Sequence, residues 1–197
     1  MSRVQVNPFS TRYIKPGSIQ FESDEIELSG IIRVLQICGQ GQIVGPHGSG
    51  KSTLVASLLR ESQFDSIEVR HLVCRSGLKE IMTLQTGSTV QPQLLVIDGF
   101  EQFGWLARAA IQQFCRKQRM LLLITSHKSI AGLPVLARLS PSSEKFVELA
   151  GRLQAQTGSR LTVNDAEALQ VFVECGGNMR EGFMSLYDRY QVKSLKN

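Results

Sequence analysis

The stretch GQGQIVGPHGSGKST, residues 39–53, decides the fold of this chain. Residues 45–52 within it fit the pattern G-x-x-x-x-G-K-[ST] at every position. β-branched residues precede the glycines, and the apolar residues of LVASLL, 54–59, follow at helical spacing. The pattern therefore predicts a strand, a glycine loop and a helix. In that arrangement the loop N–H groups and the helix N-terminus bind a nucleotide phosphate.

Each part of this loop has a predicted role in binding ATP and Mg²⁺. Gly45 and Gly50 permit a positive φ and a close approach of the backbone to phosphate. Lys51 is placed to reach the β- and γ-phosphate oxygens, and the Ser52 hydroxyl is a ligand for Mg²⁺. The alternative is a glycine-rich turn that happens to contain lysine. The predicted nucleotide contacts are Gly45, Pro46, His47, Gly48, Ser49, Gly50, Lys51, Ser52 and Thr53.

Composition indicates an ordinary globular protein. The 197 residues are enough for one domain with a small appendage, and they are 42% apolar and 20% charged. No apolar run approaches the roughly 18 residues of a membrane span, and the polar start is unlike a signal peptide. We therefore expect a cytoplasmic protein. The net charge of +5 allows an anionic partner, but bound nucleotide accounts for part of it, so support for nucleic acid is weak.

The four cysteines point to a reducing compartment. Cys38, Cys74, Cys115 and Cys175 lie far apart in apolar stretches, and no two have C-x-x-C spacing. We expect all four to be small buried side chains, neither disulfide-bonded nor metal-ligating.

A second candidate residue, Asp98, ends the continuous apolar run Leu94–Asp98. Such a run predicts a parallel strand buried on both faces, with the acid at its carboxyl end, where open α/β sheets bind ligands. Asp98 is therefore predicted to hold Mg²⁺ together with Ser52. In the alternative, Asp98 caps the following helix in a capping box with Glu101.

Another apolar run, residues 120–124, ends in Thr125-Ser126-His127. Polar side chains at this strand end are predicted to hydrogen-bond the γ-phosphate or the attacking water. Alternatively they begin a loop.

The whole pattern predicts an α/β fold of three layers, with a mainly parallel sheet and a small C-terminal helical lid. Residues 1–24 are expected to form an extended arm, 25–141 the phosphate-loop core, and 142–197 the lid. The predicted anchors of the arm are Phe9, Tyr13, Ile14 and Phe21.

Three further local patterns concern helices. A capped start is expected at residues 23–26, and Asn178 with Glu181 predicts a capping box for the last helix. A core-facing stripe is expected from Phe103, Leu106, Ala110, Ile111 and Phe114.

These motifs resemble a known family. Residues 45–53 match a Walker A motif and Leu94–Asp98 resembles Walker B, so the chain looks like a P-loop NTPase. The order of parts from about residue 25 to 192 resembles the AAA+ branch, which contains replication-initiator and clamp-loader ATPases. That resemblance makes Thr125-Ser126 a "sensor 1" and proposes Arg180, in GGNMRE at 176–181, as the "sensor 2" arginine for the γ-phosphate. The Asn7-Pro8-Phe9 arm also resembles that of small bacterial P-loop proteins, which implies no activity.

The chain departs from the AAA+ pattern at two residue positions, and its predicted lid is short. Gly99 stands where these proteins usually carry a glutamate, and the nearest carboxylate, Glu101, either orients water or caps its helix. Arg138 lies within the last predicted strand, and Arg116 and Arg119 end the preceding helix, so no arginine occupies a clear arginine-finger position. Slow hydrolysis, or binding with little turnover, would follow.

We therefore expect a Mg²⁺-dependent ATP hydrolase that acts as a nucleotide switch, with Lys51, Asp98 and Glu101 as catalytic residues and Thr125, His127 and Arg180 reporting on the γ-phosphate. Its expected partners are nucleotide and an unidentified protein. One alternative is a small-molecule kinase, because kinases share the phosphate loop and a mobile lid. The other is a nucleotide-dependent binding module with negligible turnover.

Overall fold

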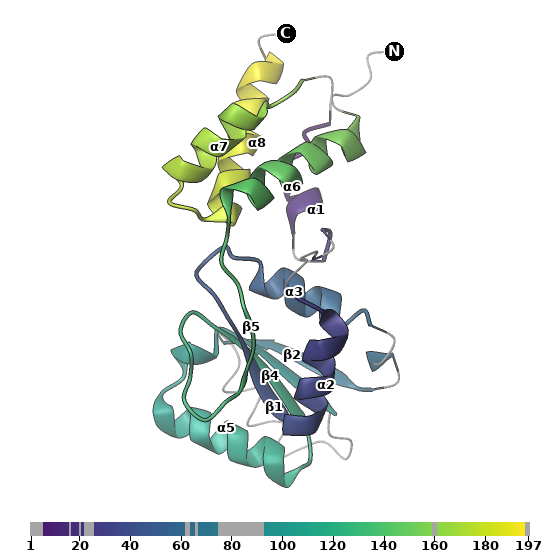
Figure 1. Cartoon of the computed structure of the whole chain (residues 1–197), viewed down its shortest axis with the longest axis vertical. Helices are drawn as coiled ribbons and strands as arrows, with labels where there is room; N and C mark the ends of the chain where they lie inside the picture. Colours follow the sequence, from purple (N-terminus) through teal and green to yellow (C-terminus); the bar gives the residue numbers. More distant parts are fainter. Residues whose placement is uncertain are drawn as a thin grey trace. The chain divides into compact units, whose positions relative to one another are not determined.

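The computed structural model describes residues 6–15, 17–19, 21, 26–61, 64–65, 67–74, 93–158 and 161–195 (Figure 1). The chain forms two compact units. The sheet unit comprises Phe21–Gly45 and Leu54–Leu139, and the helical unit comprises Met1–Gln20, Pro46–Thr53 and Ser140–Asn197. Most of the phosphate loop thus belongs to the helical unit.

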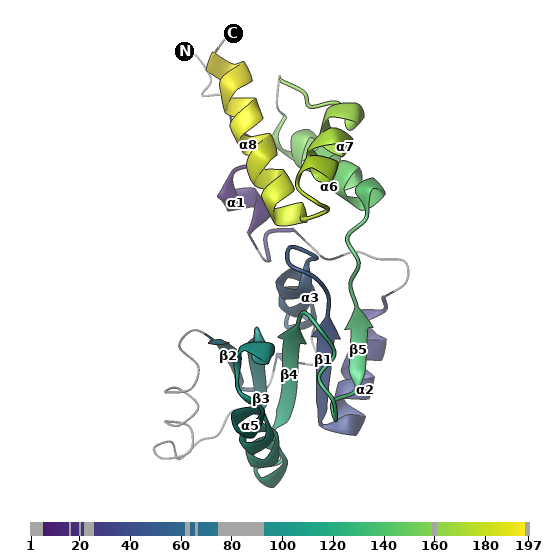
Figure 2. The same cartoon turned by 90° about the vertical axis from the view of Figure 1, so that its left-hand side faces the viewer.

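Five strands form one sheet in the order β2-β3-β4-β1-β5 (Figure 2). Every pairing among these described strands is parallel, which confirms the predicted α/β class. Val44 pairs with Ser126, and Ile97 pairs with Ile124, so β1, β4 and β3 end along the same edge of the sheet. We call this edge the carboxyl edge. The strand bounds are β1 Gln40–Val44, β2 Val69–Val73, β3 Leu94–Asp98, β4 Leu121–Ser126 and β5 Val135–Arg138.

Helices cover both faces of this sheet because the apolar strands alternate their side chains between them. Leu94 and Val96 pack with helices α2 (Leu28–Cys38) and α3 (Lys51–Leu58). Leu95 and Ile97 pack on the other side, with α5 (Trp105–Lys117) and the 3₁₀ turn η2 (Phe100–Gln102). All four side chains are fully buried, so the prediction of a strand buried on both faces is confirmed.

Helix α2 begins at Leu28 and continues through Gly30. The expected capped start at 23–26 falls mostly outside the described residues.

The predicted apolar stripe on α5 is partly wrong. Leu106 is 65% exposed and Ala110 is exposed, whereas Ile111 and Cys115 are buried against the sheet. The helix begins only at Trp105, and residues 107, 111, 114 and 115 form its sheet-facing side. Phe103 is buried as predicted, but it packs from the segment before the helix.

The helical unit contains α1 (Thr11–Ile14), α6 (Ser143–Thr157), α7 (Asp165–Glu174) and α8 (Met179–Leu195). Its core gathers aromatic side chains from the N-terminal arm and from α6, α7 and α8, with Phe9, Phe146 and Tyr190 almost fully buried. Ser142 caps α6 by accepting from the Lys145 N–H, and Asn164 caps α7 by accepting from the Glu167 N–H. The helical C-terminal region is therefore confirmed.

The N-terminal arm is not extended throughout, because Thr11–Ile14 forms one helical turn. Phe9, Tyr13 and Ile14 pack in the core of the helical unit, and Phe21 packs against the core of the sheet unit. The domain boundaries at residues 24 and 141 stay predictions.

The four cysteines are free thiols. Cys115 is buried, and burial raises its pKa to about 12. The expectation of four buried cysteines holds for Cys115 alone, because Cys74 and Cys175 are only partly buried and Cys38 is exposed. Cys38 is the last residue of α2, where the chain leaves the core.

Within the described part of the chain, no helix combines the length and the apolar character that crossing a membrane requires.

Gly41 in β1 provides a test of the packing between β1 and β5. A Cβ at this position would lie 2.4 Å from Cδ1 and 2.5 Å from Cγ of Leu136. We predict that Gly41→Ala lowers the free energy of unfolding in urea by about 1–3 kcal/mol, because Leu136 must move. The control is Gly151→Ala, since no heavy atom lies within 4 Å of its added Cβ in α6. That change should raise the free energy of unfolding by about 0.5–1 kcal/mol; equal unfolding curves for both variants would contradict the packing described here.

Candidate functional site

The phosphate loop joins β1 to α3, as predicted. In the sheet unit, the Gly45 N–H donates to the Ser126 carbonyl at 3.1 Å, which ties the start of the loop to the end of β4. Positive φ angles occur at Gly48 (68°) and Gly50 (89°). The expectation of a positive φ is thus correct for Gly50 and wrong for Gly45, where the chain still continues from the strand.

In the rest of the loop, the Lys51 side chain bonds to the backbone of the loop itself. Lys51 is 9% exposed, and its ammonium donates to the Pro46 carbonyl at 2.7 Å. Ser49 Oγ is buried and has no hydrogen-bond partner among the described residues. A buried hydroxyl without a hydrogen-bond partner destabilises the folded protein. A ligand that accepts a hydrogen bond from Ser49 would remove this cost. A phosphate oxygen meets this need, and the loop therefore fits the group that its sequence pattern predicts.

The N-terminus of α8 lies against this loop inside the helical unit. Asn178 Oδ1 accepts from the N–H groups of Arg180 (3.1 Å) and Glu181 (3.3 Å). A Cβ added to Gly48 would lie 1.9 Å from that Oδ1 and 3.2 Å from the Arg180 nitrogen. The Asn178 N–H donates to Cys175 instead of to Glu181, so only half of the predicted capping box forms. The loop and the backbone of the predicted sensor 2 residue are thus neighbours, while the Arg180 side chain is exposed.

Asp98 is held by Thr125 from the neighbouring strand. The Thr125 hydroxyl donates to Asp98 Oδ1 and accepts from the Gly99 N–H at 3.1 Å. Thr125 is 1% exposed, so water does not compete with these bonds. The turn after β3 has Gly99 at its N-cap position and no side-chain cap. Gly99, and not Asp98, therefore occupies the cap position of this turn.

The backbone of the turn explains why glycine, and not the glutamate usual in AAA+ proteins, follows Asp98. Its φ is +78°, and an added Cβ would lie 2.7 Å from Gln102 Nε2. A glutamate there would be strained. The turn instead presents its carboxylate two residues later, at Glu101 of η2.

Glu101 meets His127, which follows the end of β4. His127 Nδ1 lies 3.1 Å from Glu101 Oε1. The Glu101 side chain is 24% exposed overall, but both of its oxygens are buried. Burial and, secondly, the Glu101 charge raise the pKa of the Cys74 thiol at the end of β2.

Gln42 is a supporting residue that sequence reasoning missed. Its fully buried amide donates to the Ile130 carbonyl at 2.8 Å and to the Leu133 carbonyl at 2.7 Å, and it accepts from the Ile130 N–H at 2.9 Å. These bonds fix the loop that follows His127. The available signal was an amide residue inside a strand that is otherwise buried.

The predicted residues thus fall into two groups. The sheet unit brings Gly45, Asp98, Glu101, Thr125 and His127 to the carboxyl edge. The helical unit contains residues 46–53 and places Gly48 beside the backbone of Arg180. A magnesium site shared by Ser52 and Asp98 would span both units, and it stays a prediction.

Comparison with solved structures identifies the fold. No protein-family model matches the chain, and no curated protein matches it significantly. Domain III of the replication initiation protein DnaA from Thermotoga maritima superposes with a TM-score of 0.61 at 14% identity, covering 98% of this chain and 92% of that domain. The fold is therefore that of the AAA+-like P-loop NTPases, which confirms the resemblance.

Two longer structures show the same fold. A DNA replication initiation factor has a TM-score of 0.59 at 14% identity over 84% of this chain. A DnaA bound to AMPPCP and single-stranded DNA has a TM-score of 0.56 at 13% identity over 85%. The chain spans 59% and 65% of these two proteins, which is less than two thirds of each.

Thr125 can be tested by removing its hydroxyl while keeping its shape. We predict that Thr125→Val weakens ATP binding about tenfold in Mg²⁺, because Asp98 loses the bond that orients it. Affinity measured in EDTA should stay within about twofold of the parent, and Thr125→Ser should behave like the parent in both buffers. An equal loss with and without Mg²⁺ would instead indicate general damage to the fold.

Asn178 and Asn164 form a matched pair of helix caps. Each accepts from the backbone of its own helix, but Asn178 also lies against Gly48. We predict that each change to alanine costs about 1 kcal/mol of stability. Calorimetric titration should show weaker ATP binding for Asn178→Ala and unchanged binding for Asn164→Ala. Unchanged binding in both variants would contradict a link between α8 and the loop.

Proposed function

We propose that this chain is an ATP-binding P-loop protein that hydrolyses ATP slowly with Mg²⁺ and acts as a nucleotide switch. Its main support is the line of contacts along the carboxyl edge. Gly45 is bonded to Ser126 at the end of β4, and Thr125 is bonded to Asp98 at the end of β3. The first residue of the phosphate loop and the predicted metal ligand are therefore tied to the same strand.

The predicted roles follow from the chemistry of each group. Backbone N–H groups of the loop and Ser49 Oγ bind phosphate oxygens, and Lys51 offsets their charge. Ser52 and Asp98 supply a hydroxyl and a carboxylate oxygen, the hard donors that Mg²⁺ prefers. When bound, Mg²⁺ offsets the negative charge that develops on the leaving phosphate oxygen.

Hydrolysis also needs a group that orients water, and we assign this to Glu101. The water oxygen forms a bond to the γ-phosphorus, the bond from that phosphorus to the β–γ bridging oxygen breaks, and Glu101 accepts the proton that water loses. The products are ADP and inorganic phosphate. The glutamate lies in the turn after Asp98, at the carboxyl edge where the loop begins.

The switch rests on the neighbours of the loop in the helical unit. Gly48 contacts the cap of α8, whose second residue is Arg180. A γ-phosphate that engages Arg180 would bias the position of α8, and loss of that phosphate would remove the bias. The nucleotide state would thereby reach a protein partner. AMPPCP and single-stranded DNA are bound by a DnaA of the same fold, so both are worth testing as ligands of this chain.

Turnover of ATP by the purified chain tests this function. We predict measurable phosphate release with Mg²⁺ and none in EDTA. Lys51→Ala should weaken nucleotide binding about 100-fold, because its buried ammonium is lost. Glu101→Gln should bind nucleotide as the parent does and lower kcat about 100-fold.

The control for this variant is Glu68→Gln, an exposed carboxylate that precedes β2 at the opposite edge of the sheet. Parent-like turnover in Glu101→Gln would remove Glu101 from the mechanism. Tight binding without turnover in the parent would favour the kinase or the nucleotide-dependent binding module.

A further inference from the structure

The pair formed by Glu101 and His127 goes beyond the roles that the sequence predicts. The motif pattern treats His127 as a residue that reports on the γ-phosphate. In the structure its Nδ1 lies 3.1 Å from Glu101 Oε1 instead, at ion-pair distance. This contact lies wholly within the sheet unit.

The Glu101 carboxylate needs a partner. Both oxygens are buried, and neither accepts a hydrogen bond from another described residue. A buried carboxylate without a donor or a positive neighbour is costly, because it loses its hydration. His127 is the ion-pair partner that the described residues offer.

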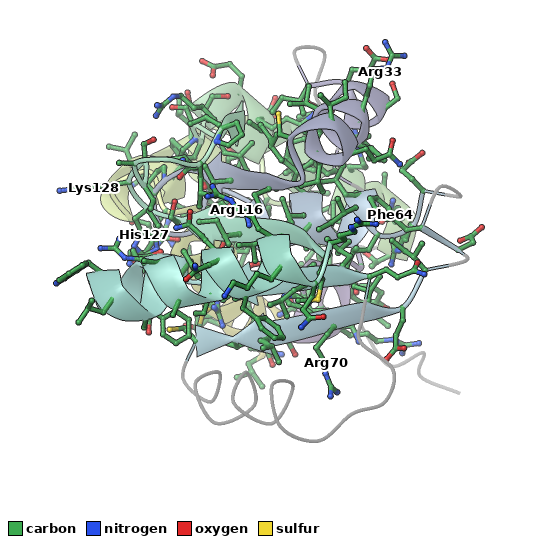
Figure 3. The ribbon with its side chains drawn as sticks, turned by 90° about the horizontal axis from the view of Figure 1, so that it is seen from below. Arg33, Phe64, Arg70, Arg116, His127 and Lys128 are labelled. Carbon is green, nitrogen blue, oxygen red and sulfur yellow. The ribbon has the colours of Figure 1, made fainter. Side chains whose placement is uncertain are left out.

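Both residues sit on fixed supports. Phe100 is fully buried and anchors η2, and the Gly99 N–H is bonded to Thr125. On the other side, the loop after His127 is bonded to Gln42. The backbone on either side of the pair is therefore held by buried contacts. Figure 3 shows the next residue, Lys128, pointing away from the molecule, while His127 lies nearer the ribbon.

We propose that His127 is a positioning residue that holds the Glu101 carboxylate through Nδ1, so that Glu101 can orient the attacking water. This inference rests on the proposed hydrolase function. It assigns His127 to the glutamate and not to the phosphate. It also explains how a chain with Gly99 after its Walker B aspartate can keep a usable carboxylate: the displaced glutamate is held from the neighbouring strand end.

The proposal can be tested by substitutions of His127 that keep a nitrogen at the position of Nδ1 or place it one bond further out. The Asn side-chain nitrogen is bonded to Cγ, as Nδ1 is in histidine, whereas the Gln nitrogen lies one bond further out. We predict that His127→Gln and His127→Ala lower kcat about ten- to 100-fold with KM within about twofold, because Glu101 is misplaced while ATP binding is not. His127→Asn should keep at least about half of the parent kcat. Lys128→Ala, the exposed neighbour, should match the parent.

Three results would overturn the proposal. A rise in KM or in the dissociation constant for ATP, with that for ADP unchanged, would make His127 a phosphate sensor. A rise in kcat for His127→Ala would mean that His127 sequesters Glu101. Parent-like kcat in His127→Gln would show that the contact is irrelevant to hydrolysis.

A second measurement does not depend on turnover. The chain has three histidines, so ring ¹⁵N signals can be assigned with His127→Asn. At about pH 6 we expect a slowly exchanging Nδ1–H proton from His127 that disappears in Glu101→Ala. If the parent released no phosphate but this proton were present, the hydrolase function would fail and the hold on Glu101 would stand. If the proton were absent, or unchanged in Glu101→Ala, the proposal that His127 positions the Glu101 carboxylate would be wrong.

Discussion

The hydrogen bonds of the Thr125 hydroxyl are the constraint on which the candidate site depends. One hydroxyl donates to Asp98 and accepts from the Gly99 N–H, so it fixes both the predicted metal ligand and the turn that follows it. Because Thr125 is buried in β4, between β3 and β1, its position is set by the parallel sheet. The parallel order of the strands thus brings their polar terminal side chains together at the carboxyl edge, where a ligand can bind.

The same turn explains the unusual acid in this chain. A left-handed φ and a close Gln102 side chain favour glycine directly after Asp98, the position where AAA+ proteins usually carry glutamate. The carboxylate that stands nearest in the sequence is instead that of Glu101. Its oxygens are buried, and its ion-pair partner among the described residues is His127. A glutamate displaced by two residues therefore needs support that its usual position does not, and the end of the neighbouring strand can provide it.

The sequence predicted those parts that depend on local pattern. Residues 45–53 specify strand, loop and helix through their glycines, and Leu94–Asp98 specify a buried strand through unbroken apolar character. Long-range contacts were harder to predict from the sequence. Nothing local shows that Leu106 faces solvent, that the amide of Gln42 bonds to the loop after β4, or that Glu101 meets His127, because each depends on partners far along the chain. Gly45 lacks the positive φ that was expected of it, and its N–H bonds to the Ser126 carbonyl, whereas Gly48 has a positive φ that was not expected.

Our central proposal is that Asp98, which is held by Thr125, binds the metal ion that accompanies the nucleotide. Its most direct test is paramagnetic broadening of backbone amide signals by Mn²⁺ bound with ADP. We predict that the amide signals of Ser52, Gly99 and Thr125 broaden together, while that of Gly132, in the segment between β4 and β5, stays sharp. Broadening at Ser52 with sharp Gly99 and Thr125 signals would contradict it, because Asp98 would then lie away from the metal.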